Sequence, residues 1–73
     1  SMEVITVKSL FDYCLEQLKK GNGDKFVFVF NGEEANNYRP LYFQFEDNPY
    51  TVKYELNRTG NSNIDSRKVV LLG

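Results

Sequence analysis

Side chains able to do chemistry are scarce in this sequence of 73 residues, which has no histidine and a single cysteine, Cys14. The absence of histidine excludes a Ser-His or Cys-His nucleophile pair and removes the commonest general base near neutral pH. Cys14 lies within an apolar helical pattern, where a thiol packs as a small hydrophobe. We therefore expect a buried structural cysteine, with a reactive thiol as the alternative.

The acidic side chains include two adjacent carboxylate pairs, Glu33-Glu34 and Glu46-Asp47. Neighbouring residues in an extended chain point to opposite faces, so neither pair is expected to converge on one substrate atom. Oxygen ligands also cluster over 31–37, but their spacing is not that of an EF-hand loop. The GNG run at 21–23 follows a helical pattern and lacks the lysine and hydroxyl of a phosphate loop. We expect a protein that is not an enzyme, with no catalytic residue, cofactor or metal.

Nucleic-acid binding is the alternative function, because the chain has six phenylalanines and five tyrosines, and aromatic rings on a sheet can stack on bases. The formal net charge of −1 and the pI near 5.3 lack the basic excess typical of such proteins. Four aromatics that alternate with polar residues are expected to fill the core instead: Phe43, Phe45, Tyr50 and Tyr54. The nucleic-acid candidates are Tyr38, Arg39, Tyr42, Arg58, Arg67 and Lys68.

A helix over residues 6–20 is the strongest element that the sequence predicts. Thr6 is a suitable N-cap, and Gly21 suits the left-handed position after the last turn. Ser9 at the third helical position is neither Glu nor Gln, so a full capping box is not expected. One face of this helix carries an apolar stripe with helical spacing: Val7, Leu10, Phe11, Cys14, Leu15 and Leu18.

Four strands are expected after the helix, over residues 25–31, 40–46, 50–57 and 67–72. Each range is rich in β-branched or aromatic residues, or alternates apolar with polar residues, and turn-forming residues separate the ranges. The run 46–49 is short enough to be a hairpin turn. The order predicts an α+β fold, with one N-terminal helix packed on a four-stranded, mainly antiparallel β-sheet, in a single domain over residues 1–73.

The first and last of these strands are apolar on both faces, whereas one helix can cover only one side of a sheet. The uncovered residues lie either under the chain's own loops or against a second copy or partner, and the pattern leaves both open. Exposed apolar area of a few hundred Å² is typical of an interface. The interface candidates are Val27, Val29, Tyr42, Val69 and Val70.

The segment TVKSLFDYCLEQLKKGNGDKFVFVF, followed by YRPLYF and closing on RKVVLLG, resembles small bacteriophage and prophage accessory proteins. The resemblance implies a small α+β protein that binds and blocks another macromolecule. It carries no site motif, so it assigns no functional residue. The NRTGNSNIDS run and the many phenylalanines depart from that pattern.

The sequence has no apolar run of about 18 residues and no basic-then-apolar leader, so no membrane partner is expected and we predict a cytoplasmic protein. Together these patterns predict a non-enzymatic interaction module that binds a protein partner or itself, as a homodimer. Pairing at a strand edge is one mechanism for such binding.

Overall fold

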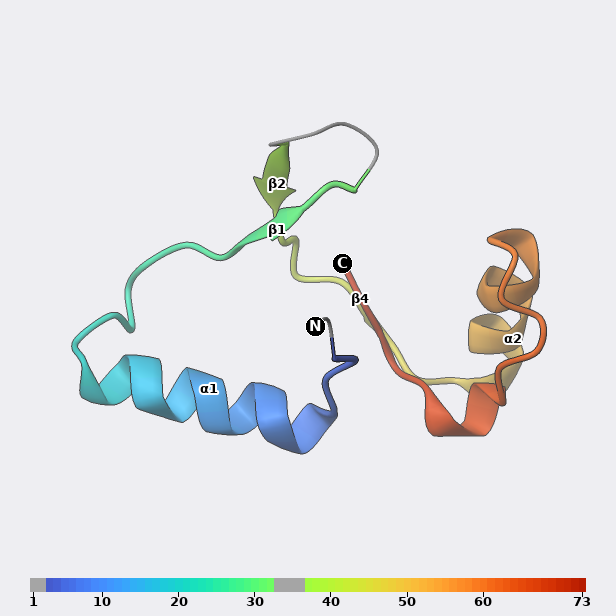
Figure 1. Ribbon diagram of the computed structural model, residues 1–73, viewed down its shortest axis with the longest axis horizontal. Helices are drawn as coiled ribbons and strands as arrows, with labels where there is room; N and C mark the ends of the chain where they lie inside the picture. Colours follow the sequence, from blue (N-terminus) through green and yellow to red (C-terminus); the bar gives the residue numbers. More distant parts are fainter. Residues whose placement is uncertain (1–2, 33–36) are drawn as a thin grey trace.

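The computed structural model describes residues 3–32 and 37–73, and it shows an open α+β arrangement with principal extents of 39 × 28 × 27 Å. Helix α1 (Val7–Lys19) lies along one side, and helix α2 (Pro49–Arg58) stands at the other end with the 3₁₀ turn η1 (Ser66–Lys68) (Figure 1). A hairpin of strands β1 (Phe28–Phe30) and β2 (Tyr38–Pro40) projects between them. Strands β3 (Phe45–Glu46) and β4 (Leu71–Leu72) form a narrow ribbon that leads to the α2 end.

Helix α1 confirms the predicted helix, and its N-terminus is better capped than expected. The Thr6 hydroxyl accepts from the Ser9 N–H at 3.1 Å, and the Ser9 hydroxyl accepts from the Thr6 N–H at 2.8 Å. This reciprocal pair is a capping box, so the expectation that serine could not complete one was wrong. At the other end Gly21 has φ +81°, and its N–H donates to the carbonyl of Leu18 at 3.0 Å.

The expected four-stranded sheet was wrong, because the strands pair as two separate two-stranded antiparallel sheets, β1 with β2 and β3 with β4. The predicted strand 40–46 is broken in the middle. Gln44 donates its N–H to the carbonyl of Tyr42 at 2.8 Å, a three-residue turn that bends the chain. The bend directs Phe45 and Glu46 away from the hairpin and toward β4.

The predicted strand 50–57 and the predicted hairpin turn at 46–49 were also wrong, because α2 occupies Pro49–Arg58. Asn48 is its N-cap, and the Asn48 Oδ1 accepts from the Tyr50 N–H at 2.9 Å. Pro49 stands at the start of the helix, where its missing N–H costs no hydrogen bond. Val52 and Leu56 lie one helical turn apart, so the alternating pattern that suggested a strand also places two apolar residues on one helix face.

The core of the described residues is small and lies at the α2 end. Its buried hydrophobic side chains are Val52, which is 0% exposed, and Leu56. The predicted strand 67–72 is only partly a strand, because its first residues belong to η1. Asp65 caps η1 through Oδ1, which accepts from the Arg67 N–H at 3.0 Å. Folding therefore concentrates packing around α2 and leaves the α1 half with no buried residue of its helix.

Helices of the described residues are too short and too polar to cross a membrane.

Candidate functional site: an open apolar surface

The apolar stripe of helix α1 is called the α1 stripe below, and the described residues of the chain do not cover it. Phe11 is 63% exposed and Leu18 60% exposed, Val7 and Leu15 are exposed too, and only Leu10 of the stripe's leucines is half-buried. An amphipathic helix in a folded protein normally buries its apolar face against another element. The expectation that α1 packs on a sheet is therefore wrong in this structure, and its apolar face is without a cover.

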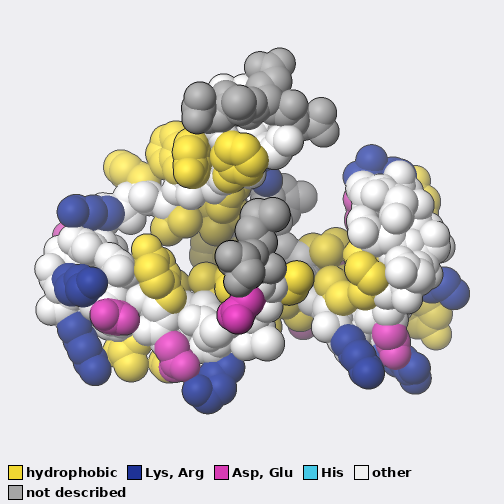
Figure 2. Space-filling model, viewed as in Figure 1, with side chains coloured by type: hydrophobic (Ala, Val, Ile, Leu, Met, Phe, Trp, Pro, Cys, Tyr) yellow, Lys and Arg dark blue, Asp and Glu magenta, His cyan; other side chains and the backbone are white. Residues whose placement is uncertain are grey.

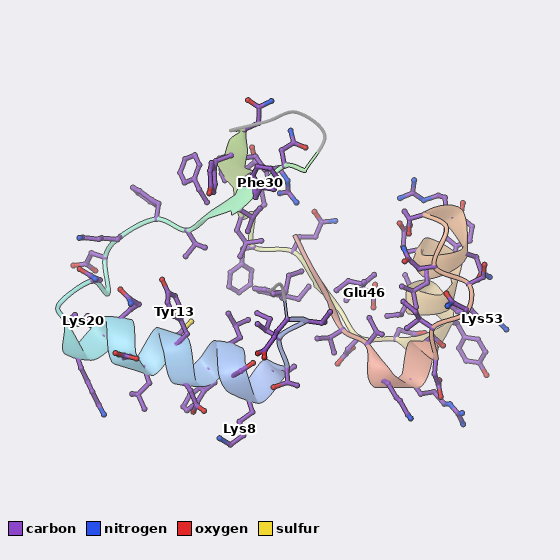
Figure 3. The ribbon with its side chains drawn as sticks, viewed as in Figure 1. Lys8, Tyr13, Lys20, Phe30, Glu46 and Lys53 are labelled. Atoms are coloured by element: carbon purple, nitrogen blue, oxygen red, sulfur yellow. The ribbon has the colours of Figure 1, made fainter. Side chains whose placement is uncertain are left out.

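The chain after α1 turns back beside the helix and leaves a hollow of about 440 Å³. One wall is the C-terminal half of α1, and the other is the segment 22–28. Figure 2 shows hydrophobic side chains over the β1–β2 hairpin and in the space between the hairpin and α1. In Figure 3, Tyr13 points from α1 toward that space, whereas Lys8 points away from it.

Two local contacts fix the turn that forms this hollow. The Asn22 side-chain amide donates to the Gln17 Oε1 at 2.7 Å. Gly23 passes so close to α1 that an added Cβ would lie 2.9 Å from the Leu18 Cδ2. The glycine lets the backbone approach the helix, and the turn brings Phe26, Val27 and Phe28 to the same hollow as Leu18.

The segment 26–28 extends the apolar surface beyond the helix. Phe26 is 92% exposed, and Val27 and Phe28 are exposed as well. The α1 stripe and Phe26, Val27 and Phe28 are together called the open apolar surface below. Of the stripe, Cys14 and Leu18 line the hollow together with these three residues, and exposed apolar area of this kind is typical of interaction sites.

The structure places the interface candidates in two groups. Val27 belongs to the open apolar surface, and Val29 beside it in β1 is half-buried. Val69 is half-buried and Val70 exposed, next to β4, and Tyr42 is exposed in the bend before β3. The loops that the structure describes therefore do not cover Val27 or Val70. The sequence prediction missed Phe11, Leu18 and Phe26 as surface residues, although the periodicity of α1 marked the first two as apolar.

The aromatic residues expected in the core are exposed instead. Phe43 is 93% exposed, and Phe45, Tyr50 and Tyr54 are exposed too. Phe43 and Phe45 contact each other edge to face, with ring centroids 4.7 Å apart. The prediction assumed that alternation marked one buried strand face, but 50–57 is helical and 40–46 is bent, so no common face forms.

Cys14 is exposed, so the prediction of a buried structural cysteine was wrong. The helix stripe that contains the thiol was expected to lie under a sheet, and that sheet does not form. Cys14 instead lines the hollow with Tyr13 and Leu18.

The nucleic-acid candidates do not gather on one face. Tyr38 and Arg39 lie on β2, whereas Arg58, Arg67 and Lys68 lie at the α2 end (Figure 1). Arg39 has a structural role, because its Nη1 donates to the carbonyl of Gly73 at 2.9 Å and so ties the two sheets together.

Two of these cations are also held by carboxylates of their own chain. Arg58 forms an ion pair with Glu55, and this hydrogen bond raises the pKa of Arg58. The Arg67 guanidinium donates to both carboxylate oxygens of Asp65, and these side-chain hydrogen bonds lower the pKa of Asp65 to about 2. Local pairing of this kind reduces the positive potential that phosphate binding needs.

The carboxylate pairs form no metal-binding group in the part that the structure describes. Glu46 uses its Oε2 to accept from the Asn48 N–H at 3.1 Å, at the entry to α2. Residues 3–32 and 37–73 contain no group of three or more His, Cys, Asp or Glu side chains placed to hold a metal. The pair Glu33-Glu34 lies outside the described residues.

The chain as a whole exposes more surface than its mass predicts. Its accessible area is 6895 Å², whereas a compact folded chain of this mass exposes about 4,700 Å². The radius of gyration is 14.1 Å, against about 11 Å for a compact domain of this length. The open apolar surface accounts for part of this surplus area.

Comparison of the chain with models of protein families, with curated proteins and with solved structures finds no match.

Proposed function

We propose that this protein is a non-enzymatic interaction module that docks its open apolar surface against another macromolecule. The observation that supports the proposal is the uncovered stripe of α1, in which Phe11 and Leu18 are both more than half exposed. A stripe of this kind adds no stability to a lone chain, whereas burial in a complex stabilises the complex.

The free energy that burial of this surface contributes is comparable with the cost of association. Full burial of one Leu, Val or Phe side chain contributes about 1.5–3 kcal/mol. The exposed stripe offers Val7, Phe11, Leu15 and Leu18, and the 26–28 segment adds three more apolar residues. Association itself costs about 4–15 kcal/mol. These side chains are already partly buried in the lone chain, so burying the rest of their surface contributes a free energy of the same order as that cost, and the apolar surface of the partner adds to it.

The lack of histidine supports a binding role over catalysis. Arg39, Arg58 and Arg67 form hydrogen bonds or ion pairs within the chain, which supports a binding role over nucleic-acid recognition. The resemblance to phage accessory proteins suggests the biological form of that role. In our proposal the protein acts by occupying a surface of its target.

Site-specific photocrosslinking tests the docking surface directly. A benzoyl-phenylalanine at Phe11, on the stripe, is expected to form covalent adducts in cells that express the protein. The matched control carries the same group at Asp12, an exposed residue of α1 outside the stripe. Adducts from Phe11 and none from Asp12 support the proposal, and equal yields, or none from either position, contradict it.

A further inference from the structure

We infer that the occupant of the open apolar surface is a second copy of this chain, with the two α1 helices packed antiparallel across a twofold axis. This inference rests on the proposed function, because it names the partner of the same surface. Three features of the chain lead to it: the amount of surplus area, the arrangement of the stripe and the charge balance of α1.

The surplus area has the size that a stable dimer buries. The chain exposes 6895 Å², which is about 2,200 Å² more than a compact monomer of its mass. Obligate homodimers bury about 2,000–5,000 Å² in total over both chains. The open apolar surface accounts for part of this surplus on each chain, and burying about half of the surplus on each of two copies reaches this range.

The stripe can pair with itself in the antiparallel direction. Apolar residues lie at similar distances on both sides of its middle, with Val7 near one end of α1 and Leu18 near the other. Antiparallel packing sets Val7 against Leu18 of the partner subunit and Phe11 beside Cys14 of the partner subunit. The contact is isologous, because each helix offers the same residues, as a twofold interface requires.

The charges of α1 permit this pairing. Within Val7–Lys19 two lysines balance Asp12 and Glu16, and the whole chain carries a formal charge of −1. Asp12 is paired with Lys8 of the same helix at 3.0 Å, and Glu16 with the C-cap residue Lys20 at 3.7 Å. Two α1 helices therefore do not repel each other through an excess of like charge. The helix also has no excess charge that would favour an acidic or a basic partner.

Light scattering on the full chain, with a variant of the stripe, tests the inference. The wild type is expected to have twice the mass of the 8.5 kDa chain. Leu18→Glu places a charge in the contact twice per dimer, and we expect the dissociation constant to rise at least 100-fold. Leu18 is exposed in the lone chain, so the variant keeps its helical circular dichroism. The control, Tyr50→Glu, adds the same charge at an exposed residue of α2 and should remain dimeric.

Cys14 provides a second readout, because it is the only cysteine of the chain and lies near the middle of the stripe. A short bismaleimide is expected to react with Cys14 of a dissociated chain and, after the chains associate again, to link it slowly to Cys14 of the second copy. The linked dimer should be lost in Leu18→Glu and in Cys14→Ser, and retained in Tyr50→Glu. Loss of the crosslink in Leu18→Glu with retained helicity supports the α1 contact even where light scattering cannot resolve weak association.

The outcomes separate the inference from the proposed function. A strict monomer at high concentration whose stripe still forms photocrosslinks to another protein overturns the second copy and keeps the docking surface. A strict monomer with a radius of gyration near 11 Å in X-ray scattering has closed on itself, and both proposals then fail. A dimer that Leu18→Glu leaves intact overturns the α1 contact.

Discussion

Val52 and Leu56 are the residues on which the α2 end of the molecule depends. They lie one turn apart on α2 and are the buried hydrophobic side chains of the described residues, on a helix that lies beside η1. Because so few side chains are buried here, each should contribute a large share of the local stability.

Truncation of this pair should therefore be costly. Leu56→Ala is expected to lower the free energy of unfolding by about 2–4 kcal/mol, from lost burial and the cavity that remains. Tyr54→Ala, at an exposed position of the same helix, should change the free energy by about 0.5 kcal/mol or less. Urea unfolding at one fixed protein concentration measures both, and equal effects would show that α2 does not hold the core.

Asp65 is the N-cap of η1, so the pKa of its carboxyl group reports whether the cap of η1 is formed. Side-chain hydrogen bonds from Arg67 lower the pKa of Asp65 from 3.8 to about 2. A carboxylate with a lowered pKa in the folded state stabilises the fold above pH about 4, and this contribution is lost as the pH falls toward 2. NMR titration of the Asp65 carboxyl carbon is expected to give a midpoint near pH 2.

Arg67→Ala tests the cause of that shift. The variant removes the side-chain hydrogen bonds but keeps the backbone N–H that donates to Asp65, so the pKa should return part of the way to 3.8. The acid-induced loss of stability between pH 4 and 2 should shrink with it. An unchanged titration would mean that the ion pair does not set the pKa.

At the scale of elements, the N-terminus of α2 decides whether residues 49–58 form a helix. The Asn48 side chain accepts from the N–H groups of Tyr50 and Thr51, at 2.9 and 3.4 Å. Asn48→Ala leaves these donors without the cap and should cost about 0.5–2 kcal/mol. Asn57→Ala, in the last turn of α2, should cost nothing, because alanine is the better helix former. Thermal unfolding followed by circular dichroism compares the two, and a neutral Asn48→Ala would contradict the capped helix.

The comparison of α1 with α2 shows what could be predicted from the sequence. In α1 the cap at Thr6, the periodic stripe and Gly21 all indicate the same element, and the helix was predicted within one residue at each end. In α2 the alternation of Tyr50, Val52 and Tyr54 favoured a strand, while Asn48-Pro49 is also a helix start. The cap and the Val52–Leu56 spacing prevailed, because the helix buries both residues.

Pairing between distant strands could not be predicted in the same way. The β3–β4 ribbon joins Phe45 to Leu72 and Glu46 to Leu71, and no local pattern specifies such a partner. For the candidate site, the α1 stripe was predicted as an apolar helix face packed on a sheet, and Val27 was named as an interface candidate that lies either under loops or against a partner. That the stripe itself is uncovered depends on the absence of a four-stranded sheet, which is a tertiary property.

At the scale of the whole molecule, the chain divides into an α2 end with a small core and an α1 half whose apolar residues face outward. The surplus of accessible area and the radius of gyration of 14.1 Å both follow from this arrangement. In our account the missing cover of α1 comes from a second copy, so the same thiol should be accessible in the dilute chain and protected in the dimer.

The labelling rate of Cys14 by a thiol reagent is the most direct measurement of that claim. In dilute native protein, below the dissociation constant, Cys14 is expected to react nearly as fast as in denaturant, because the lone chain leaves it exposed. At high concentration the rate should fall at least 10-fold, and Leu18→Glu should abolish the fall. Slow labelling of the native protein at every concentration, in the wild type and in Leu18→Glu alike, would show that the chain buries its own stripe. That result would contradict the account.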